Sequence, residues 1–319
     1  MQERSSLFVV SFLEYTMLYA NFINRRYTTE VWAYGDLRYL DKNQHMVIEY
    51  DISFLFVYFE ELWNKLLAMR MMYVGKVSAK EVTAFMLQTL PDFYSYMIKI
   101  ARFGIVDCIN ENSFTEIVKS EVFRVTVGDY MVKTVTILKL NKNRDADKLA
   151  NWFSGRPYSD YIFGDYSSLD FSEKVFAYMD FRFAQFRNSY MNATSLIGSS
   201  LIGANFRNAH MESCILDYCN ICEADFSNAM LKNASFINVY ARSGLLDEKK
   251  WRSANFLPTI FRNADLTGVK FSGADLTGAD FSGAVLTDAN FNEAIVDKAI
   301  FSEANIPLTD EQKNCVIIK

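Results

Sequence analysis

The chain has 319 residues, half of them hydrophobic and 22% charged, with a formal net charge of −5. That length predicts two domains, and the acidic balance disfavours direct binding of nucleic acid, which requires a basic surface. The five cysteines have no disulfide-like spacing, and the N-terminal stretch lacks the basic start and cleavage site of a signal peptide. We therefore expect a cytoplasmic protein without a membrane-spanning segment.

Residues 1–164 show no short repeat and predict a mostly α-helical domain. The apolar segments at residues 5–26 and 51–73 each suit a helix. Ser78 and Glu81 have the spacing of a capping box, which predicts a helix over 78–90. Pro91 then suits the first turn of a separate helix over 91–103.

The end of this domain predicts strands and a connection. Residues 122–140 are rich in β-branched side chains around Gly128-Asp129, which favours a β-hairpin. Residues 141–147 form a polar break, and residues 147–153 suit a short connecting helix. A few charges in this apolar domain, at Arg25-Arg26, Asp51 and Glu60-Glu61, leave open an unrecognised enzymatic or effector activity, although most should face solvent.

A period of five residues governs the rest of the chain. Every fifth residue from Phe171 to Ile306 is apolar, and among these 28 centres only Ala241 is not large. The residue two before each centre is usually Ala. This period fits neither an α-helix nor a β-strand, so it indicates a repeat architecture.

The position two after each centre indicates a turn. Glycine or asparagine recurs there, for example at Gly198, Gly268, Asn208 and Asn228. These residues tolerate the positive φ that a type II turn requires. One turn for every five residues predicts a coil that buries two residues of each five.

At this point the chain resembles the pentapeptide-repeat family, whose motif is A(D/N)LXX. The segments NADLT, GADLT and GADFS between residues 263 and 282 carry the resemblance. It implies a right-handed quadrilateral parallel β-helix over 165–306 with four repeats per coil. The 28 centres then give about seven coils, or about six if residues 240–253 loop out.

A period of twenty residues would stack equivalent centres in columns. One predicted column reads Phe186, Phe206, Phe226, Leu246, Leu266, Leu286 and Ile306. The segment 240–253 keeps the register but loses the small residue and gathers charges, so we interpret it as an excursion or a degenerate coil. Its candidate partner-binding residues are Arg242, Lys249, Lys250, Trp251 and Arg252, of which Trp251 is equally in register for the core.

The C-terminal end of the repeats is acidic, with seven acidic and two basic residues over 263–305. Some members of the family bind DNA gyrase as DNA mimics, so the resemblance makes these acids candidates for partner binding. We expect those that precede a centre to face solvent. The candidates are Asp265, Asp275, Asp280, Asp288, Glu293, Asp297 and Glu303.

The sequence predicts no catalytic residue, cofactor or metal. Cys214, Cys219 and Cys222 have a spacing like that of an iron–sulfur protein. The first two occupy the small inward position, where cysteine packs as a compact apolar residue. Cys222 follows a centre and should point outward, so the three should not converge. His45 and His210 lie in no recognisable catalytic motif.

Residues 307–319 suit a C-terminal cap with a short helix that opens at Thr309. The apolar run from Cys315 to Ile318 predicts either a homodimer through this end or a tail folded over the last coil. The function that we expect is non-enzymatic: a bacterial protein whose rigid β-helix presents a surface to a protein partner. A DNA-mimic modulator of gyrase or topoisomerase is the main alternative.

Overall fold

The chain divides into two compact units, residues 1–142 and 143–319. The computed structural model describes residues 8–40, 45–108, 111–129, 134–142, 145–147, 149, 161–243, 257–302 and 306–318. Most of the connecting helix predicted over 147–153 and most of the excursion over 240–253 lie outside these residues. The buried apolar side chains form two separate clusters, one in each unit.

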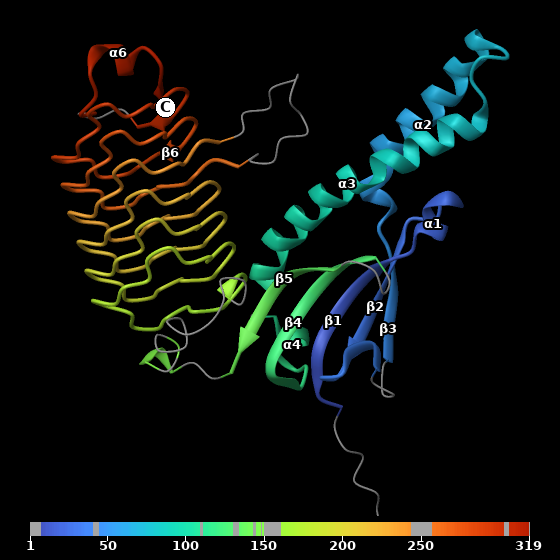
Figure 1. Cartoon of the computed structure of the whole chain (residues 1–319), viewed down its shortest axis with the longest axis horizontal. Coiled ribbons are helices and arrows are strands. Elements are labelled where there is room, and N and C mark those ends of the chain that lie inside the picture. Colours follow the sequence, from blue (N-terminus) through green and yellow to red (C-terminus); the bar gives the residue numbers. More distant parts are fainter. Residues whose placement is uncertain are drawn as a thin grey trace, which may run out of the picture. The chain divides into compact units, whose positions relative to one another are not determined.

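The N-terminal unit is built on a five-stranded mixed sheet (Figure 1). The strands are β1 (Val10–Met17), β2 (Thr28–Tyr34), β3 (His45–Asp51), β4 (Lys119–Asp129) and β5 (Thr134–Asn141). They follow the order β3-β2-β1-β4-β5. β1 runs parallel to β4, and the other neighbours are antiparallel. β4 and β5 thus form a hairpin where the sequence favours one.

The prediction of a mostly helical domain is wrong for the first segment. Residues 5–26 contain β1 and the short helix α1 (Tyr19–Ile23) in place of one helix. β1 lies between β2 and β4, and six of its eight residues are buried. A central strand that is covered on both faces has an almost continuous apolar sequence, which cannot be distinguished from a buried helix by periodicity alone.

Three further α-helices of this unit lie between β3 and β4 in the sequence: α2 (Val57–Met69), α3 (Ala79–Cys108) and α4 (Asn112–Thr115). Short 3-10 helices lie between the same two strands at Ser53–Phe56 and Arg70–Tyr73, and another, Arg38–Leu40, lies between β2 and β3. The capping box is present, because Ser78 N–H donates to Glu81 and Glu81 N–H donates to Ser78 Oγ. The expected break at Pro91 is absent: α3 continues through this exposed residue.

An aromatic core joins the helices to the sheet. Phe59 and Trp63 are the buried residues of α2, and the ring of Phe59 packs edge-on against Phe93 of α3 at 4.8 Å. Phe56 stacks on Tyr27 at 4.7 Å, just before β2. This packing fixes the end of the α2–α3 pair that lies nearest the sheet. The other end of the pair extends beyond the sheet (Figure 1).

The second unit is a parallel β-helix whose rungs are seen in Figure 1. Most bridges join residues twenty apart, as in Asp165 with Gln185 and Gln185 with Asn205. The centres from Phe171 to Phe281 that the structure describes are buried. Positive φ recurs every five residues at the position two after a centre, at non-glycine residues as well as glycines. The five-residue pattern therefore corresponds to one side of a coil.

The pairing register changes once, and this corrects the predicted columns. Asp225 pairs with Ile260, and Tyr240 pairs with Asp275, so these partners are 35 residues apart. One coil thus contains fifteen residues more than the others. Thr259 Oγ nevertheless donates to the carbonyl of Ala241 at 3.2 Å, so the two ends of this insertion lie close together. A constant register of five in the sequence concealed the change because fifteen is a multiple of five.

The true column of Phe186 consists of phenylalanines. Its members are Phe186, Phe206, Phe226, Phe261, Phe281 and Phe301, and not the leucines predicted after Phe226. Their rings stack nearly parallel, with centroids 4.8–5.1 Å apart. These separations match the spacing between neighbouring strands, so each ring fills the space of one coil.

The C-terminal segment folds back on the β-helix. β8 (Ile317–Ile318) pairs in parallel with β7 (Ile300–Phe301), which pairs with β6 (Asp280–Phe281). The short helix α6 (Asp310–Lys313) begins with a capping box formed by Thr309 and Gln312. Gln312 Nε2 also donates to the carbonyls of Phe291 and Ala294, both at 2.9 Å. The tail therefore covers part of the open end of the coil, which would otherwise leave unpaired backbone groups.

Candidate functional site

Short hydrogen bonds give the β-helix a rigid frame. Most Ser, Thr and Cys side chains at the inward position two before a centre donate to a carbonyl of the preceding coil, whereas Ser189 donates to Phe186 of its own coil. Thr194 Oγ reaches the carbonyl of Phe171 at 2.8 Å, and Ser199 Oγ reaches that of Phe176 at 2.9 Å. Bonded polar groups inside the coil cost little, whereas unpaired ones would be strongly unfavourable. The frame therefore presents its outer side chains at fixed spacing.

One side of the β-helix is apolar over its first coils. We call it the Tyr178 face, and it comprises Val175, Tyr178, Ile197, Ile215, Tyr218 and Ile237. Val175 is 74% exposed, and Tyr178 and Tyr218 are 67% and 64% exposed. The bridges from Val175 through Ser195 to Ile215 place these residues on one side. Tyr178 N–H donates to Ile197 O, and Tyr218 N–H donates to Ile237 O, which places each tyrosine next to an isoleucine.

A glycine allows Tyr178 to lie flat on this side. Gly198 occupies the next coil at the same corner, with φ of +66°. A Cβ atom there would lie 2.6 Å from the tyrosine ring, closer than side chains pack. The ring therefore rests on the backbone of the neighbouring coil, and its outer side remains exposed.

The structure does not gather the predicted acidic residues on one surface. The bridge columns place Asp265 and Asp288 on one side of the coil, and Asp275 and Asp297 on another. Glu293 belongs to a third side and Asp280 to the fourth. Glu303 lies outside the described residues. A partner that follows one side of the rod would meet only part of this set.

Asp280 corrects the expectation that the aspartates before centres face solvent. It is only 1% exposed, and Arg262 forms an ion pair with it at 2.6 Å. Burial alone would raise the pKa of the Asp280 carboxyl, but hydrogen bonds from Ser282 and the pair with Arg262 outweigh burial and lower that pKa. Asp265 pairs similarly with Lys232 at 3.5 Å. These carboxylates are partly neutralised by neighbouring coils.

The structure describes one of the candidate partner-binding residues of the excursion. Arg242 is exposed on the described side of the insertion. Lys249, Lys250, Trp251 and Arg252 lie outside the described residues. The partner-binding role of this segment stays a prediction.

The three cysteines within the coils have structural surroundings. Cys214 and Cys219 donate to the carbonyls of Met191 and Leu196, and burial raises the pKa of each thiol to about 12. Cys222 was expected to point outward, but it is buried, and burial raises its pKa to about 12 as well. Such thiols carry almost no thiolate at neutral pH and are poor metal ligands and nucleophiles. Among the described residues, no group of His, Cys, Asp and Glu could hold a metal ion.

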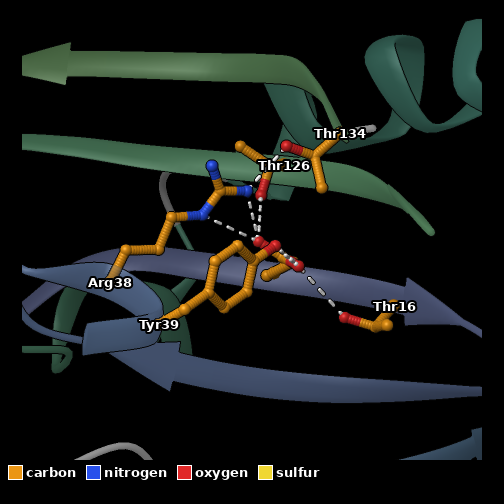
Figure 2. Close-up of polar contacts among 6 residues, drawn as sticks. Thr16, Arg38, Tyr39, Thr126 and Thr134 are labelled. Carbon is orange, nitrogen blue, oxygen red and sulfur yellow. Dashed lines mark hydrogen bonds and ion pairs between the residues drawn. The ribbon is translucent and has the colours of Figure 1, made fainter. Parts of the chain in front are cut away.

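A buried carboxylate in the N-terminal sheet was not singled out from the sequence as a site. Figure 2 shows the residues that surround Glu14 of β1, whose side chain is fully buried. Arg38 Nη2 donates to its Oε2 at 2.5 Å, and Tyr39 Oη donates to its Oε1 at 2.6 Å. Thr16 and Thr126 add longer contacts of 3.3 Å. Glu14 is the only charged residue of β1, and this was the signal that could have identified it.

The Glu14 network joins separate parts of the sheet. Arg38 belongs to the connection between β2 and β3, and its Nη2 also donates to Thr134 Oγ at the start of β5. Both carboxylate oxygens have donors, so the charge is paired and no acceptor is left free for a proton transfer to substrate. The arrangement favours a structural role over general acid or base catalysis.

The other charges singled out in the N-terminal unit are also paired. Arg25 forms an ion pair with Glu60 at 3.1 Å, and Arg26 pairs with Glu49 at 2.6 Å. Asp51 accepts a hydrogen bond from Ser53 N–H at 2.7 Å. Burial and a hydrogen bond with Glu60 raise the pKa of Tyr27 above its usual range. Arg25, Tyr27 and Glu60 line a shallow hollow of about 500 Å³, where Glu60 pairs with Arg25 and accepts a hydrogen bond from Tyr27 Oη.

The comparison with protein-family models matches the second unit. The model described as pentapeptide repeats matches residues 180–217, 252–283 and 264–303, with eight copies. The second unit contains pentapeptide repeats. The matched residues include coils on both sides of the insertion.

Solved structures with pentapeptide repeats resemble the chain at low identity. Rfr23 from the cyanobacterium Cyanothece 51142 is 14% identical, with 43% of this chain and 90% of that chain covered and a TM-score of 0.22. A trypsin-treated variant of QnrB1, a plasmid-mediated fluoroquinolone resistance protein, is 19% identical, with 50% and 65% covered and a TM-score of 0.23. HetL from Nostoc sp. PCC 7120, involved in heterocyst differentiation regulation, is 15% identical, with 50% and 97% covered and a TM-score of 0.14.

The comparison with curated proteins found no match. Within the described parts of the chain, every helix is too short or too polar to cross a membrane.

Proposed function

We propose that this chain is a non-enzymatic interaction protein whose β-helix presents a rigid surface to a protein partner. The observation that carries the proposal is the Tyr178 face. Exposed tyrosines and β-branched residues stand there on a hydrogen-bonded frame. Tyrosine is enriched among the residues that anchor protein interfaces, because it offers a large contact area with little conformational freedom to lose.

The composition of this face supports a protein partner. Val175, Ile215 and the two tyrosines supply apolar area, and Asp217 on the same side is engaged by Ser235 and the backbone N–H of Ile237. A surface that lacks a basic cluster does not suit nucleic acid. Its rigidity lowers the entropy lost on binding.

The test is affinity capture from cells of the source organism with the full chain as bait. The variant Tyr178→Asn/Tyr218→Asn removes both rings but keeps a residue that tolerates positive φ, as Asn238 does at the same corner. We expect it to lose the proteins that the parent captures. Tyr190→Asn, which removes an exposed tyrosine from another side, should retain them. Retention by the double variant, or loss by both variants, would contradict the proposal.

No single side of the coils gathers the acidic residues that the DNA-mimic alternative requires. The acidic candidates are distributed over four sides, and Asp265 and Asp280 form ion pairs with basic residues. A DNA mimic needs a contiguous acidic face that reproduces the regular charge of the phosphate backbone. We therefore place protein binding through the Tyr178 face before gyrase binding.

The proposal also includes the handedness and number of the coils, the cellular location and the oligomeric state. Right-handed winding and about six coils follow from the family resemblance. A cytoplasmic location is supported by the five free cysteines, which suit a reducing compartment. A homodimer through the C-terminal end stays a prediction; β8 already pairs with β7, but Ile317 and Ile318 remain exposed there.

A further inference from the structure

The tip of the α2–α3 pair exposes a group of large apolar side chains. α2 ends at Met69, a 3-10 helix follows, and Gly75 with φ of +76° turns the chain towards α3. We call the exposed residues the hairpin tip: Met69, Met71, Met72, Tyr73, Val74 and Val77. Met72 and Val74 are each 81% exposed. Figure 1 shows this end of the helix pair extending beyond the sheet of its own unit.

The exposure belongs to an ordered turn. Lys76 N–H donates to Tyr73 O at 2.9 Å, and the capping box of Ser78 and Glu81 fixes the start of α3. Nearer the sheet, the same helices bury their apolar residues, such as Trp63 and Met86. The apolar surface of the hairpin is therefore covered at its base and uncovered at its tip.

The charges around the tip have one sign. Residues 62–80 contain Lys65, Arg70, Lys76 and Lys80 and no aspartate or glutamate. The acids that flank this stretch are engaged: Glu61 lies 3.9 Å from Lys65, and Glu81 caps α3. Because Lys65 is paired with Glu61, the positive charge near the exposed apolar group comes from Arg70, Lys76 and Lys80.

We propose that the hairpin tip inserts its apolar side chains into the surface of an anionic phospholipid bilayer. Apolar side chains bordered by lysine and arginine are the combination that binds such surfaces, because the first enter the acyl boundary and the second pair with headgroups. A projecting tip can be surrounded by lipid without a complementary groove. No membrane-spanning helix is needed for this mode of binding, which is separate from the Tyr178 face.

The first experiment is sedimentation of the full chain with vesicles of phosphatidylcholine, with and without phosphatidylserine. We expect the parent to bind the anionic vesicles more than about tenfold more tightly, because each basic residue near the surface contributes about fivefold. Met72→Glu/Val74→Glu should remove this binding. The matched control Val285→Glu/Ile295→Glu places the same charges at exposed apolar sites of the β-helix and should bind like the parent.

A second variant separates charge from apolar insertion. Lys76→Gln/Lys80→Gln should weaken binding to anionic vesicles by about tenfold or more and leave a remainder that depends less on salt. Tyr178→Asn/Tyr218→Asn should bind vesicles like the parent. Equal binding of the parent to neutral and anionic vesicles would overturn the proposal, as would unchanged binding by the tip variant. A dimer that the tip variant dissociates, without vesicle binding by the parent, would assign the tip to a second copy of the chain.

Discussion

Glu14 depends on its neighbours for its charge to be tolerated inside the sheet. Its side chain is fully buried, whereas that of Arg38 is 28% exposed. Removing one partner of a buried pair costs more than the pair contributes, because the other charge loses its compensation. The intact network therefore adds little net stability, but the loss of one partner should destabilise the sheet strongly.

We expect Glu14→Ala to lower the free energy of unfolding of the N-terminal unit by about 3 kcal/mol. Urea unfolding followed by circular dichroism measures this loss. The matched control is Glu49→Ala, which breaks the exposed pair with Arg26 and should change stability by less than about 1 kcal/mol. Equal effects of the two substitutions would show that Glu14 is not held by a buried network.

Asp280 gives the repeat unit a pH-dependent contribution. Its pKa is lowered in the folded protein, so the contribution is present above its usual value of 3.8 and is lost as the pH falls through the folded pKa. Asp280→Asn should retain the turn, as Asn290 does two coil sides later, but lose the charge pair with Arg262.

The expected loss for Asp280→Asn is about 1 kcal/mol at pH 7. Thermal unfolding at several pH values should show the difference from the parent shrinking below about pH 4. Asp297→Asn, at an exposed site, serves as the control and should have no comparable effect. A difference that grows as the pH falls would contradict the sign derived for Asp280.

At the scale of elements, the phenylalanine column stabilises the repeat unit by burying one ring in each coil. Phe226 lies between Phe206 and Phe261, with parallel rings at 4.9 and 5.1 Å. Phe226→Asp places a charge where no partner is available, which should cost several kcal/mol and prevent folding of the coils.

Phe226→Leu is the informative companion variant. It leaves an apolar side chain and should lower stability by only about 1–2 kcal/mol. Circular dichroism and thermal melting distinguish the two. If Phe226→Asp melted like the parent, the inward assignment of the centres would be wrong.

The fifteen-residue insertion should be dispensable for the folding of the β-helix. Ser243 ends one side of a coil, and Thr259 begins the next, in the position two before centre Phe261. Deleting the fifteen residues 244–258 would restore the twenty-residue spacing from Asp225 to Ile260. We expect a folded β-helix with a melting temperature within about 5 °C of the parent. An aggregated or unfolded product would contradict the close approach of Thr259 to Ala241.

The repeat unit and the N-terminal unit differed in how far the sequence could predict them. A period of five, with glycine and asparagine at the turns, was sufficient to predict the coils, because each side of a coil is determined locally. The columns after Phe226 could not be predicted, because an insertion of fifteen residues leaves a five-residue register unchanged. β1 was mistaken for a helix because it is a central strand with buried residues on both faces, and because its parallel partner β4 is distant in sequence.

The candidate sites also differed in how far the sequence could predict them. Exposed tyrosines at corners could be placed on a side only when the columns were known, so the Tyr178 face was not predicted. The composition singled out the acidic residues as candidates, but their distribution over four sides could be found only from the pairing register. Glu14 was visible as the one charged residue of β1, but its donors outside β1 come from two other segments of the chain.

At the scale of the whole molecule, two units with separate cores carry two different exposed apolar surfaces. The Tyr178 face lies on a rigid frame and suits a protein. The hairpin tip is surrounded by basic residues and suits a lipid surface. The two proposals together describe a molecule that brings a protein partner and a lipid surface together.

The most direct test of this account is photo-crosslinking in cells from a benzophenone amino acid placed at position 218. The ring replaces Tyr218 on the Tyr178 face, and the control places the same amino acid at Tyr190 on another side of the coil. We predict a discrete covalent adduct with a protein from position 218 and none from position 190. Adducts that are absent from position 218, or that are the same from both positions, would contradict the claim that this face binds a partner.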